Sequence, residues 1–190
     1  MMKAKLIGIL LLAVAACTPK SEYQVMLERE LASEVRNDSL FLGFHFGMSQ
    51  KDFYASCWDM NKQGLLIQGP SNLSVEYFLD DELDFPAFMR FYPQFDQQNA
   101  IYNMPVEFVY KAYAPWDKTT SSDSLLLDVK DLMEDWYGEG FVFLEDPEGA
   151  RSVWVKVDGN RRIRIFKRDV SVVAMDISDM TNGKMKEKDG

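Results

Sequence analysis

Apolar residues recur three or four positions apart in three stretches of the chain, the spacing that places them on one face of a helix. These stretches lie within residues 18–38, at residues 50–63 and between Thr120 and Gly138. Residues that favour helix starts and stops flank them. They are Ser21 with Gln24, Ser49, Gly64, Thr120 with Asp123, and Gly138. The pattern therefore predicts three helices.

Shorter runs with alternating or continuous apolar residues and many aromatic and β-branched side chains separate these helices, and they predict strands. The turn sequences Gly69-Pro70 and Asp158-Gly159 lie between runs, and the second predicts a hairpin. The expected strands are 39–47, 65–68, 74–79, 87–92, 106–113, 141–145, 152–157, 162–167 and 171–177.

The order of these elements predicts an α+β fold built from two consecutive units, each a helix followed by antiparallel strands. Residues 39–118 would form the first unit and residues 119–180 the second, with the helices packed on one face of an antiparallel sheet. Residues 17–38 would form a tether and an N-terminal helix, which either packs on the domain or stands off as a charged spacer. Residues 181–190 are polar and are expected to form a flexible tail.

The order of elements over residues 39–180 resembles the β-lactamase-inhibitor-protein-like group and, more loosely, the SmpA/OmlA outer-membrane assembly lipoproteins. The segment Phe46–Phe53, with Gly47, Met48 and Ser49 at a helix start, is similar to the helix start of those families. This resemblance implies a binding or scaffold role through protein contact. It assigns no functional residue.

The N-terminus has the features of an export signal. Lys3 and Lys5 precede an apolar run at residues 6–16, which is too short to span a bilayer. The small residues before Cys17 resemble the lipobox of bacterial lipoproteins. That resemblance implies removal of residues 1–16 and a membrane anchor of acyl chains, palmitate among them, on Cys17. Thr18 then favours the outer membrane of the cell envelope. The alternative is an ordinary secretory signal with an incidental cysteine.

Composition narrows the possible functions. The 190-residue chain is 47% hydrophobic and 27% charged, as globular proteins are, and its formal net charge of −9 argues against nucleic acid as a partner. Two cysteines and one histidine exclude a Cys/His zinc module and a disulfide framework. We expect no metal and no other cofactor. With Cys17 acylated, Cys57 has no partner within the chain, and its position on a predicted helix favours burial over reactivity.

The last hairpins carry the strongest candidate for a binding surface. Alternation places Val153, Val155 and Val157 on one side of their strand, and Ile163 and Ile165 on one side of the next. If both sets face the helices, the opposite face is positive and aromatic. This face would hold Trp154, Lys156, Arg162, Arg164, Phe166 and Arg168. The alternative is a solvated face whose cations discourage edge-to-edge pairing.

Other candidate sites are weaker. The acidic residues between Glu76 and Asp84 lack the spacing of a calcium loop and favour a solvated turn. His45 points away from Phe44 and Phe46 and has no second histidine to assist it, which favours a structural role. The aromatic residues of 85–116 belong mostly to a core, although some could stack on sugar rings.

The sequence therefore predicts a non-enzymatic, lipid-anchored protein of the cell envelope that binds an envelope protein or a glycan through the exposed sheet face. The alternatives are a glycan-binding surface lipoprotein and a hydrolase with paired carboxylates. An open sheet would favour protein contact, a groove floored by aromatic rings would favour a glycan, and two facing carboxylates in a cleft would favour an enzyme.

Overall fold

The computed structural model describes residues 20–70, 73–146 and 152–185 of the chain. The predicted signal segment 1–16, the candidate acylation site Cys17 and the last residues of the expected tail, 186–190, lie outside the described residues. Within the described ranges, no helix combines the length and the apolar character needed to cross a bilayer.

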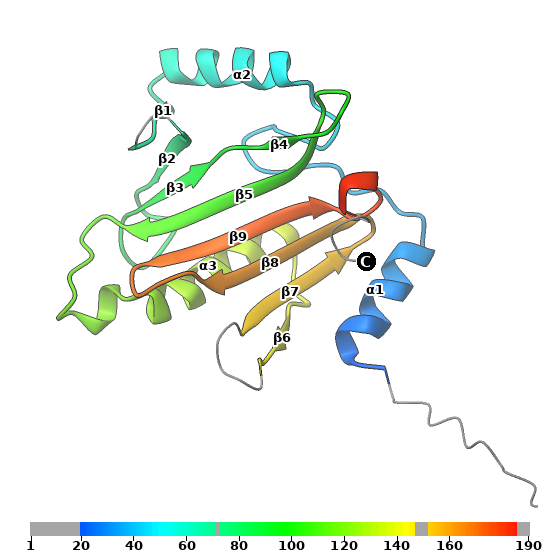
Figure 1. Ribbon diagram of the computed structural model, residues 1–190. Helices are drawn as coiled ribbons and strands as arrows, with labels where there is room; N and C mark the ends of the chain where they lie inside the picture. The colour runs from blue at the N-terminus through cyan, green and yellow to red at the C-terminus, as the bar shows by residue number, and fades with distance from the viewer. Residues whose placement is uncertain (1–19, 71–72, 147–151, 186–190) are drawn as a thin grey trace, which may run out of the picture.

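The described chain is an α+β protein, as the element order predicts, with helices against one antiparallel sheet (Figure 1). The helices are α1 (Glu22–Ala32), α2 (Gln50–Lys62), the short 3-10 helix η2 (Lys118–Thr120) and α3 (Ser122–Tyr137). The strands are β1 (Leu66–Gln68), β2 (Val75–Leu79), β3 (Ala87–Phe91), β4 (Gln94–Phe95), β5 (Ile101–Tyr110), β6 (Val142–Leu144), β7 (Val153–Asp158), β8 (Arg161–Lys167) and β9 (Val172–Asp179).

The two predicted units share a single sheet. Across the described strands the order is β1-β2-β3-β5-β9-β8-β7-β6, and β4 pairs with the start of β5. The units join where β5 pairs antiparallel with β9, with Val106 opposite Met175. One hydrophobic core therefore runs across the junction, and it includes Phe108 of the first unit and Ile163 of the second.

The helices of the two units, α2 and α3, lie on the same face of the sheet, as expected. Phe53 of α2 and Val129 of α3 are fully buried in the same core cluster as Val106, Met175 and Ile163. The N-terminal helix α1, which the sequence left undecided, packs on the opposite face. Its Met26 is buried against Val155 and Val157 of β7.

Two helix starts follow the predicted caps. The Ser21 side chain accepts from Gln24 N while the Gln24 side chain accepts from Ser21 N, which is a complete capping box. Ser49 caps α2 by accepting from Asp52 N at 3.1 Å. The Thr120 box before α3 is wrong, because the buried Thr120 belongs to η2 and the helix begins after Ser121 without a side-chain cap.

The expected strand at 39–47 is also wrong. The chain turns back on itself there, with Leu40 N donating to Phe44 O at 2.9 Å and a single bridge between Ser39 and His45. Leu42 and Gly43 take positive φ values of 54° and 78°, which no strand accommodates. The turn lets the aromatic residues of this segment enter the core from one side: Phe41, Phe44 and Phe46.

Part of the expected flexible tail is packed. Asn182 Nδ2 donates to Asp96 Oδ2 at 3.1 Å, Thr181 Oγ1 bonds to Asp179 at 2.6 Å, and Met185 is 2% exposed. The polar composition of 181–185 concealed the contact of Asn182, because its partner Asp96 is distant in sequence. The prediction of a flexible tail was therefore wrong for residues 181–185.

Candidate functional site

The structure separates the predicted basic face into two. The hairpin turn pairs Asp158 with Arg161, so each even-numbered residue of β7 lies opposite an odd-numbered residue of β8. Trp154 is opposite Ile165, and cross-strand partners share a face. Lys156 likewise lies opposite the buried Ile163. The prediction that Trp154 and Lys156 share a face with Arg162, Arg164 and Phe166 was therefore wrong.

The side chains of Lys156 and Trp154 are used inside the fold. Lys156 is 9% exposed, and its Nζ donates to the carbonyl oxygens of Tyr137, Gly138 and Glu139 at 2.6, 2.7 and 2.7 Å. It therefore satisfies carbonyl groups that the C-terminus of α3 leaves without helical partners. Trp154 packs on Phe143, with ring centroids 4.9 Å apart.

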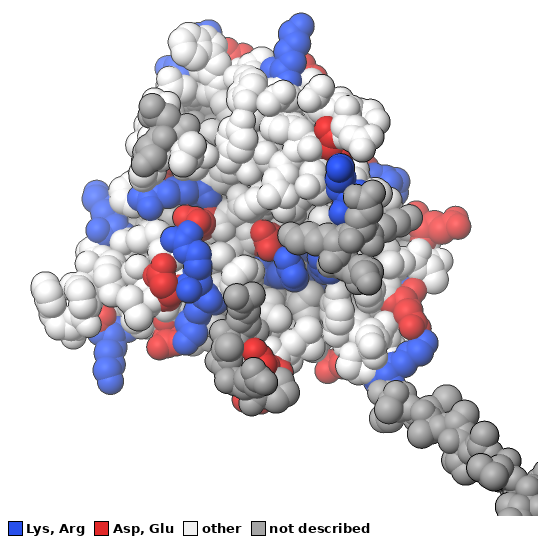
Figure 2. All heavy atoms as spheres, in the orientation of Figure 1, with Lys and Arg blue, Asp and Glu red and all other residues white. Residues whose placement is uncertain are grey.

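On the other face, each of the three predicted arginines has a partner, which is a carboxylate for two of them and a side chain of α1 for the third. Arg164 pairs with Asp176 at 2.9 Å, and Arg168 pairs with Glu107. Arg162 is buried and donates to the hydroxyl of Tyr23 in α1 at 3.3 Å. Figure 2 shows basic and acidic side chains interleaved over the face in view rather than gathered by sign. The role of these residues in binding stays a prediction, but the positive patch that motivated it is absent from the described surface.

The acidic cluster is also divided. Glu76 lies in β2, with its side chain 8% exposed, and pairs with Arg90 at 2.7 Å. Asp80, Asp81 and Glu82 are exposed in the following turn. Among the described residues, no three His, Cys, Asp or Glu side chains come together as a metal site would require. His45 is exposed, and its Nδ1 lies 2.9 Å from Phe46 O.

One carboxylate contact bears on the hydrolase alternative. Asp128 Oδ2 accepts from the Tyr110 hydroxyl and from Asp84 N, the second at 3.3 Å. Burial raises the pKa of Asp128, and the nearby charge of Asp84 adds to the effect. Neither Asp84 nor Asp128 lines the groove described next, so this pair of carboxylates could not act on a substrate bound in that groove.

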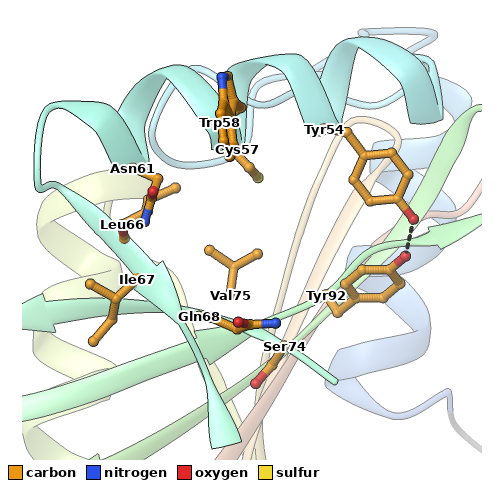
Figure 3. A pocket seen from close by; sticks show the side chains of 10 residues that line it. All are labelled: Tyr54, Cys57, Trp58, Asn61, Leu66, Ile67, Gln68, Ser74, Val75 and Tyr92. Atoms are coloured by element: carbon orange, nitrogen blue, oxygen red, sulfur yellow. Dashed lines mark hydrogen bonds between the residues drawn. The ribbon is translucent and has the colours of Figure 1, made fainter. Parts of the chain in front are cut away.

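The most distinctive concave surface is a cavity of about 390 Å³ between α2 and the strands β1 and β2, here called the α2–β1 groove (Figure 3). Ten residues line it: Tyr54, Cys57, Trp58, Asn61, Leu66, Ile67, Gln68, Ser74, Val75 and Tyr92. Its volume falls in the range of small-ligand and side-chain pockets.

Local structure explains how the groove forms. Tyr54, Trp58 and Asn61 are four and three residues apart in α2, which places them along one side of the helix. Gly64 takes a φ of 75°, so the chain can reverse and run back beneath α2 as β1. Asn61 Nδ2 donates to Leu66 O at 2.8 Å and ties the strand to the helix.

The lining carries no charged side chain, although the whole chain has a formal net charge of −9. Leu66 is 1% exposed and Val75 is half-buried, and both lie below α2 in Figure 3. Trp58, at 64% exposure, and Ile67, at 50%, stand at the rim. The groove therefore combines aliphatic side chains and the uncharged polar side chains of Asn61, Gln68 and Ser74 with an exposed apolar rim.

Cys57 points from α2 into the groove rather than into the core alone (Figure 3). It is half-buried and packs against the core cluster, so the expectation of burial holds only in part. Burial raises the pKa of the Cys57 thiol to about 11. The thiol is therefore protonated near neutral pH, which agrees with the expectation of low reactivity.

Two tyrosines close one end of the groove. The hydroxyls of Tyr54 and Tyr92 hydrogen-bond to each other, and Gln50 Nε2 donates to Tyr54 Oη at 3.2 Å. The contact with Tyr54 is the main cause of the raised pKa of Tyr92. A second cavity of about 350 Å³ shares Ser74 and Tyr92 with the groove and adds Leu73, which is 76% exposed. Because Arg90 and Glu107 also line this second cavity, the surface past the tyrosines mixes apolar and charged side chains.

Comparison with protein-family models, with curated proteins and with solved structures finds no match to this chain. The functional argument therefore depends on the geometry of the groove. The sequence pattern did not single out this site. The spacing of Tyr54 and Trp58 on a predicted helix was a visible signal, but Ile67, Val75 and Tyr92 join them only through the sheet.

Proposed function

We propose that this chain is a lipid-anchored, non-enzymatic binding protein of the cell envelope, and that the α2–β1 groove takes an apolar segment of a polypeptide partner. The uncharged, aromatic-rimmed lining of the groove carries the proposal. Charged residues are depleted and aromatic residues enriched at the centres of protein interfaces. Trp and Tyr are also the residues that most often anchor such interfaces energetically.

The groove chemistry supports binding over catalysis. Its ten lining residues include no histidine, carboxylate or lysine that could serve as a general base. Cys57 is the only strong nucleophile among them, and its raised pKa disfavours the reactive thiolate.

The arrangement of the lining also favours a polypeptide over a glycan. A sugar site would offer aromatic faces as a floor on which rings stack. Here Leu66 and Val75 form the aliphatic part of the floor, with Gln68 and Ser74 beside them, and no aromatic ring lies flat beneath it; the ring of Trp58 stands at the rim above (Figure 3). An aliphatic cavity suits an inserted apolar side chain, because burial of apolar surface drives the contact.

The test is affinity capture from detergent-solubilised envelope with a photo-crosslinking residue at Ile67, which is 50% exposed at the groove rim. The same residue at Trp116, which is 87% exposed and outside the lining, is the positional control. We expect a crosslinked protein at Ile67 and none at Trp116. Equal crosslinking at both positions would show non-specific contact.

The captured partner then permits a direct affinity measurement. Trp58→Ala should weaken binding by about 10-fold or more, because truncation of an interface Trp commonly costs more than about 1.4 kcal/mol. Trp116→Ala is the matched control and should leave the affinity within about 2-fold, since its side chain lies outside the groove. Unchanged binding by Trp58→Ala would exclude the groove. Binding that survives protease digestion of the extract would favour the glycan alternative.

A further inference from the structure

We infer that the edge of the sheet formed by α1, β6 and β7, here called the α1 edge, faces the lipid bilayer, so that the α2–β1 groove is presented away from the membrane. This inference rests on the proposed acyl anchor at Cys17 and adds an orientation to it. Four features of the described chain support it: a short tether, a docked helix, the strand order and the distribution of charge.

The tether between the anchor and the domain is short. Ser21 caps α1, and it follows Cys17 by only four residue steps. A fully extended chain spans at most about 3.6 Å per residue, so the Cα of Ser21 lies within about 14 Å of the Cα of Cys17 in any conformation. The anchor therefore holds the first turn of α1 at the membrane surface.

The helix at the end of this tether is bound to the domain rather than free to swing. Met26 is buried against Val155 and Val157, and Glu30 Oε2 accepts from Gly159 N at 3.2 Å. That hydrogen bond is the main cause of the lowered pKa of Glu30. An anchor that keeps α1 close to the bilayer therefore keeps β7 close to the bilayer as well.

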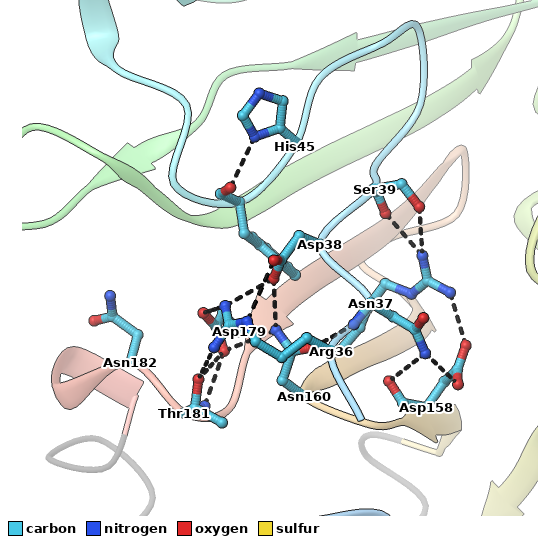
Figure 4. A network of polar contacts seen from close by, with 12 residues as sticks. Arg36, Asn37, Asp38, Ser39, His45, Asp158, Asn160, Asp179, Thr181 and Asn182 are labelled. Atoms are coloured by element: carbon cyan, nitrogen blue, oxygen red, sulfur yellow. Dashed lines mark hydrogen bonds and ion pairs between the residues drawn. The ribbon is translucent and has the colours of Figure 1, made fainter. Parts of the chain in front are cut away.

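A polar network fixes the chain just after α1 (Figure 4). Asn37 N and Nδ2 donate to the side chains of Asn160 and Asp158, each at 2.6 Å. Asn160 Nδ2 in turn donates to Asp38 and Asp179, each at 3.1 Å. Both ends of α1 are therefore tied to the same side of the sheet, and α1 moves with the domain as one body.

The groove lies at the other end of the sheet. In the strand order of the described residues, β6 and β7 end one side and β1 and β2 end the other. The eight strands along that path have seven spacings of about 4.8 Å, which separate the two edges by about 34 Å. Figure 1 shows α1 and α2 at opposite ends of the sheet. A domain held at α1 thus carries the groove away from its anchor.

Charge disfavours the alternative in which the domain lies flat on the membrane. Helix α3 carries five acidic residues and one lysine, so its side of the sheet stays net negative, and an anionic leaflet would repel it even though Lys167 pairs with Asp123 and Lys130 with Asp131. On the opposite face, Arg90, Arg164 and Arg168 each pair with a carboxylate, so these cations add little net positive charge there. Neither broad face attracts an anionic bilayer. Helix α1 is acidic as well, with Glu22 and Glu28 exposed, so the short tether rather than charge holds the α1 edge closest to the bilayer.

The test uses the acylated protein purified from envelope and reconstituted into phosphatidylethanolamine/phosphatidylglycerol vesicles that contain nitroxide-headgroup lipid. A fluorophore is attached through Val25→Cys on α1 or Ile67→Cys at the groove, each in a Cys57→Ser background. These positions are matched, at 51% and 50% exposure. We expect the Val25 probe to be quenched at least about 3-fold more than the Ile67 probe. Equal or reversed quenching overturns the orientation.

Two controls separate this inference from the anchor proposal. Flotation with the vesicles reports the anchor, so a protein that fails to float overturns both, whereas a floating protein with equal quenching overturns the orientation alone. A flexible Gly/Ser insert of about 20 residues between Lys20 and Ser21 should bring the two quenching values together, because it frees α1 from the surface. A difference that survives this insert would show that the tether does not orient the domain.

Discussion

At the residue scale, several side chains singled out by the sequence serve the fold rather than a ligand. Lys156 caps the C-terminus of α3, Trp154 packs on Phe143, and Arg164 is neutralised by Asp176. Truncation of Trp154 would therefore disturb packing, and a loss of affinity in that variant would not identify a binding face. Cys57 is different, because its side chain faces both the core and the groove.

Cys57 permits a prediction about pH. Its pKa is raised from 9.0 to about 11, so near pH 8 the native thiol has about 100-fold less thiolate than the unfolded one. The greater nucleophilicity of a high-pKa thiolate offsets up to about 10-fold of this. Iodoacetamide should therefore modify the native protein at least about 10-fold more slowly than the unfolded protein, as mass spectrometry would record.

The same shift has a consequence for stability. The folded state binds the thiol proton more tightly than the unfolded state, so the contribution of Cys57 to stability is complete below pH 9 and is lost as pH rises towards about 11. Cys57→Ser should remove this loss, and urea unfolding of both proteins at pH 8 and pH 10.5 would measure it. If iodoacetamide modified Cys57 in the native protein at pH 8 as fast as in the unfolded protein, the partly buried environment that raises its pKa would be contradicted.

At the element scale, α1 is held apart from the main core. The large core lies on the other face of the sheet, and α1 relies on a small cluster in which Met26, Val155 and Val157 are the buried members. Small clusters at the edge of a fold open locally at lower free energy than the main core. The orientation of the domain therefore depends on few apolar contacts.

Met26→Ala should loosen α1 without unfolding the sheet. Buried Met→Ala changes cost about 2 kcal/mol or more, and this loss would fall on the local opening of α1. Amide hydrogen exchange in α1 should accelerate about 10-fold or more, while amides of β8 and β9 keep their protection. The control is Val25→Ala on the same helix, at 51% exposure, which should change exchange little. Equal acceleration in both variants would show that α1 is not held by Met26.

At the scale of the whole molecule, the sheet separates the proposed membrane anchor at one edge from the proposed binding groove at the other. The α1 edge adjoins the candidate anchor, and the α2–β1 groove lies at the opposite edge with an uncharged lining. The excess of acidic residues is spread over the rest of the surface, which favours solubility of the domain outside the bilayer.

Cys17→Ala tests the anchor on which this arrangement depends. The variant should incorporate no labelled palmitate and should leave the membrane fraction, because the acyl chains have no other site of attachment in the proposal. Cys57→Ala is the matched control and should keep both the label and the membrane association. Continued labelling of Cys17→Ala would remove the lipobox interpretation, while the groove and its test would stand unchanged.

The sequence by itself determined the α+β class and most elements, because local periodicity and caps act over a few residues. The capping box at Ser21, the cap at Ser49 and the hairpin at Asp158-Gly159 all occur as predicted. The segment 39–47 was misassigned because its aromatic composition suits a strand, whereas the positive φ at Leu42 shows that core packing overrode that preference.

Only the tertiary structure decided which faces meet. Alternation within a strand shows which residues point the same way, but the register of the hairpin decides whether Trp154 joins Ile165 or Arg164. One residue of register reverses the answer, and alternation within each strand does not set that register; the length of the turn between Asp158 and Arg161 does. The groove is a similar case, because Trp58, Val75 and Tyr92 come from separate elements that meet only when α2 packs over the sheet.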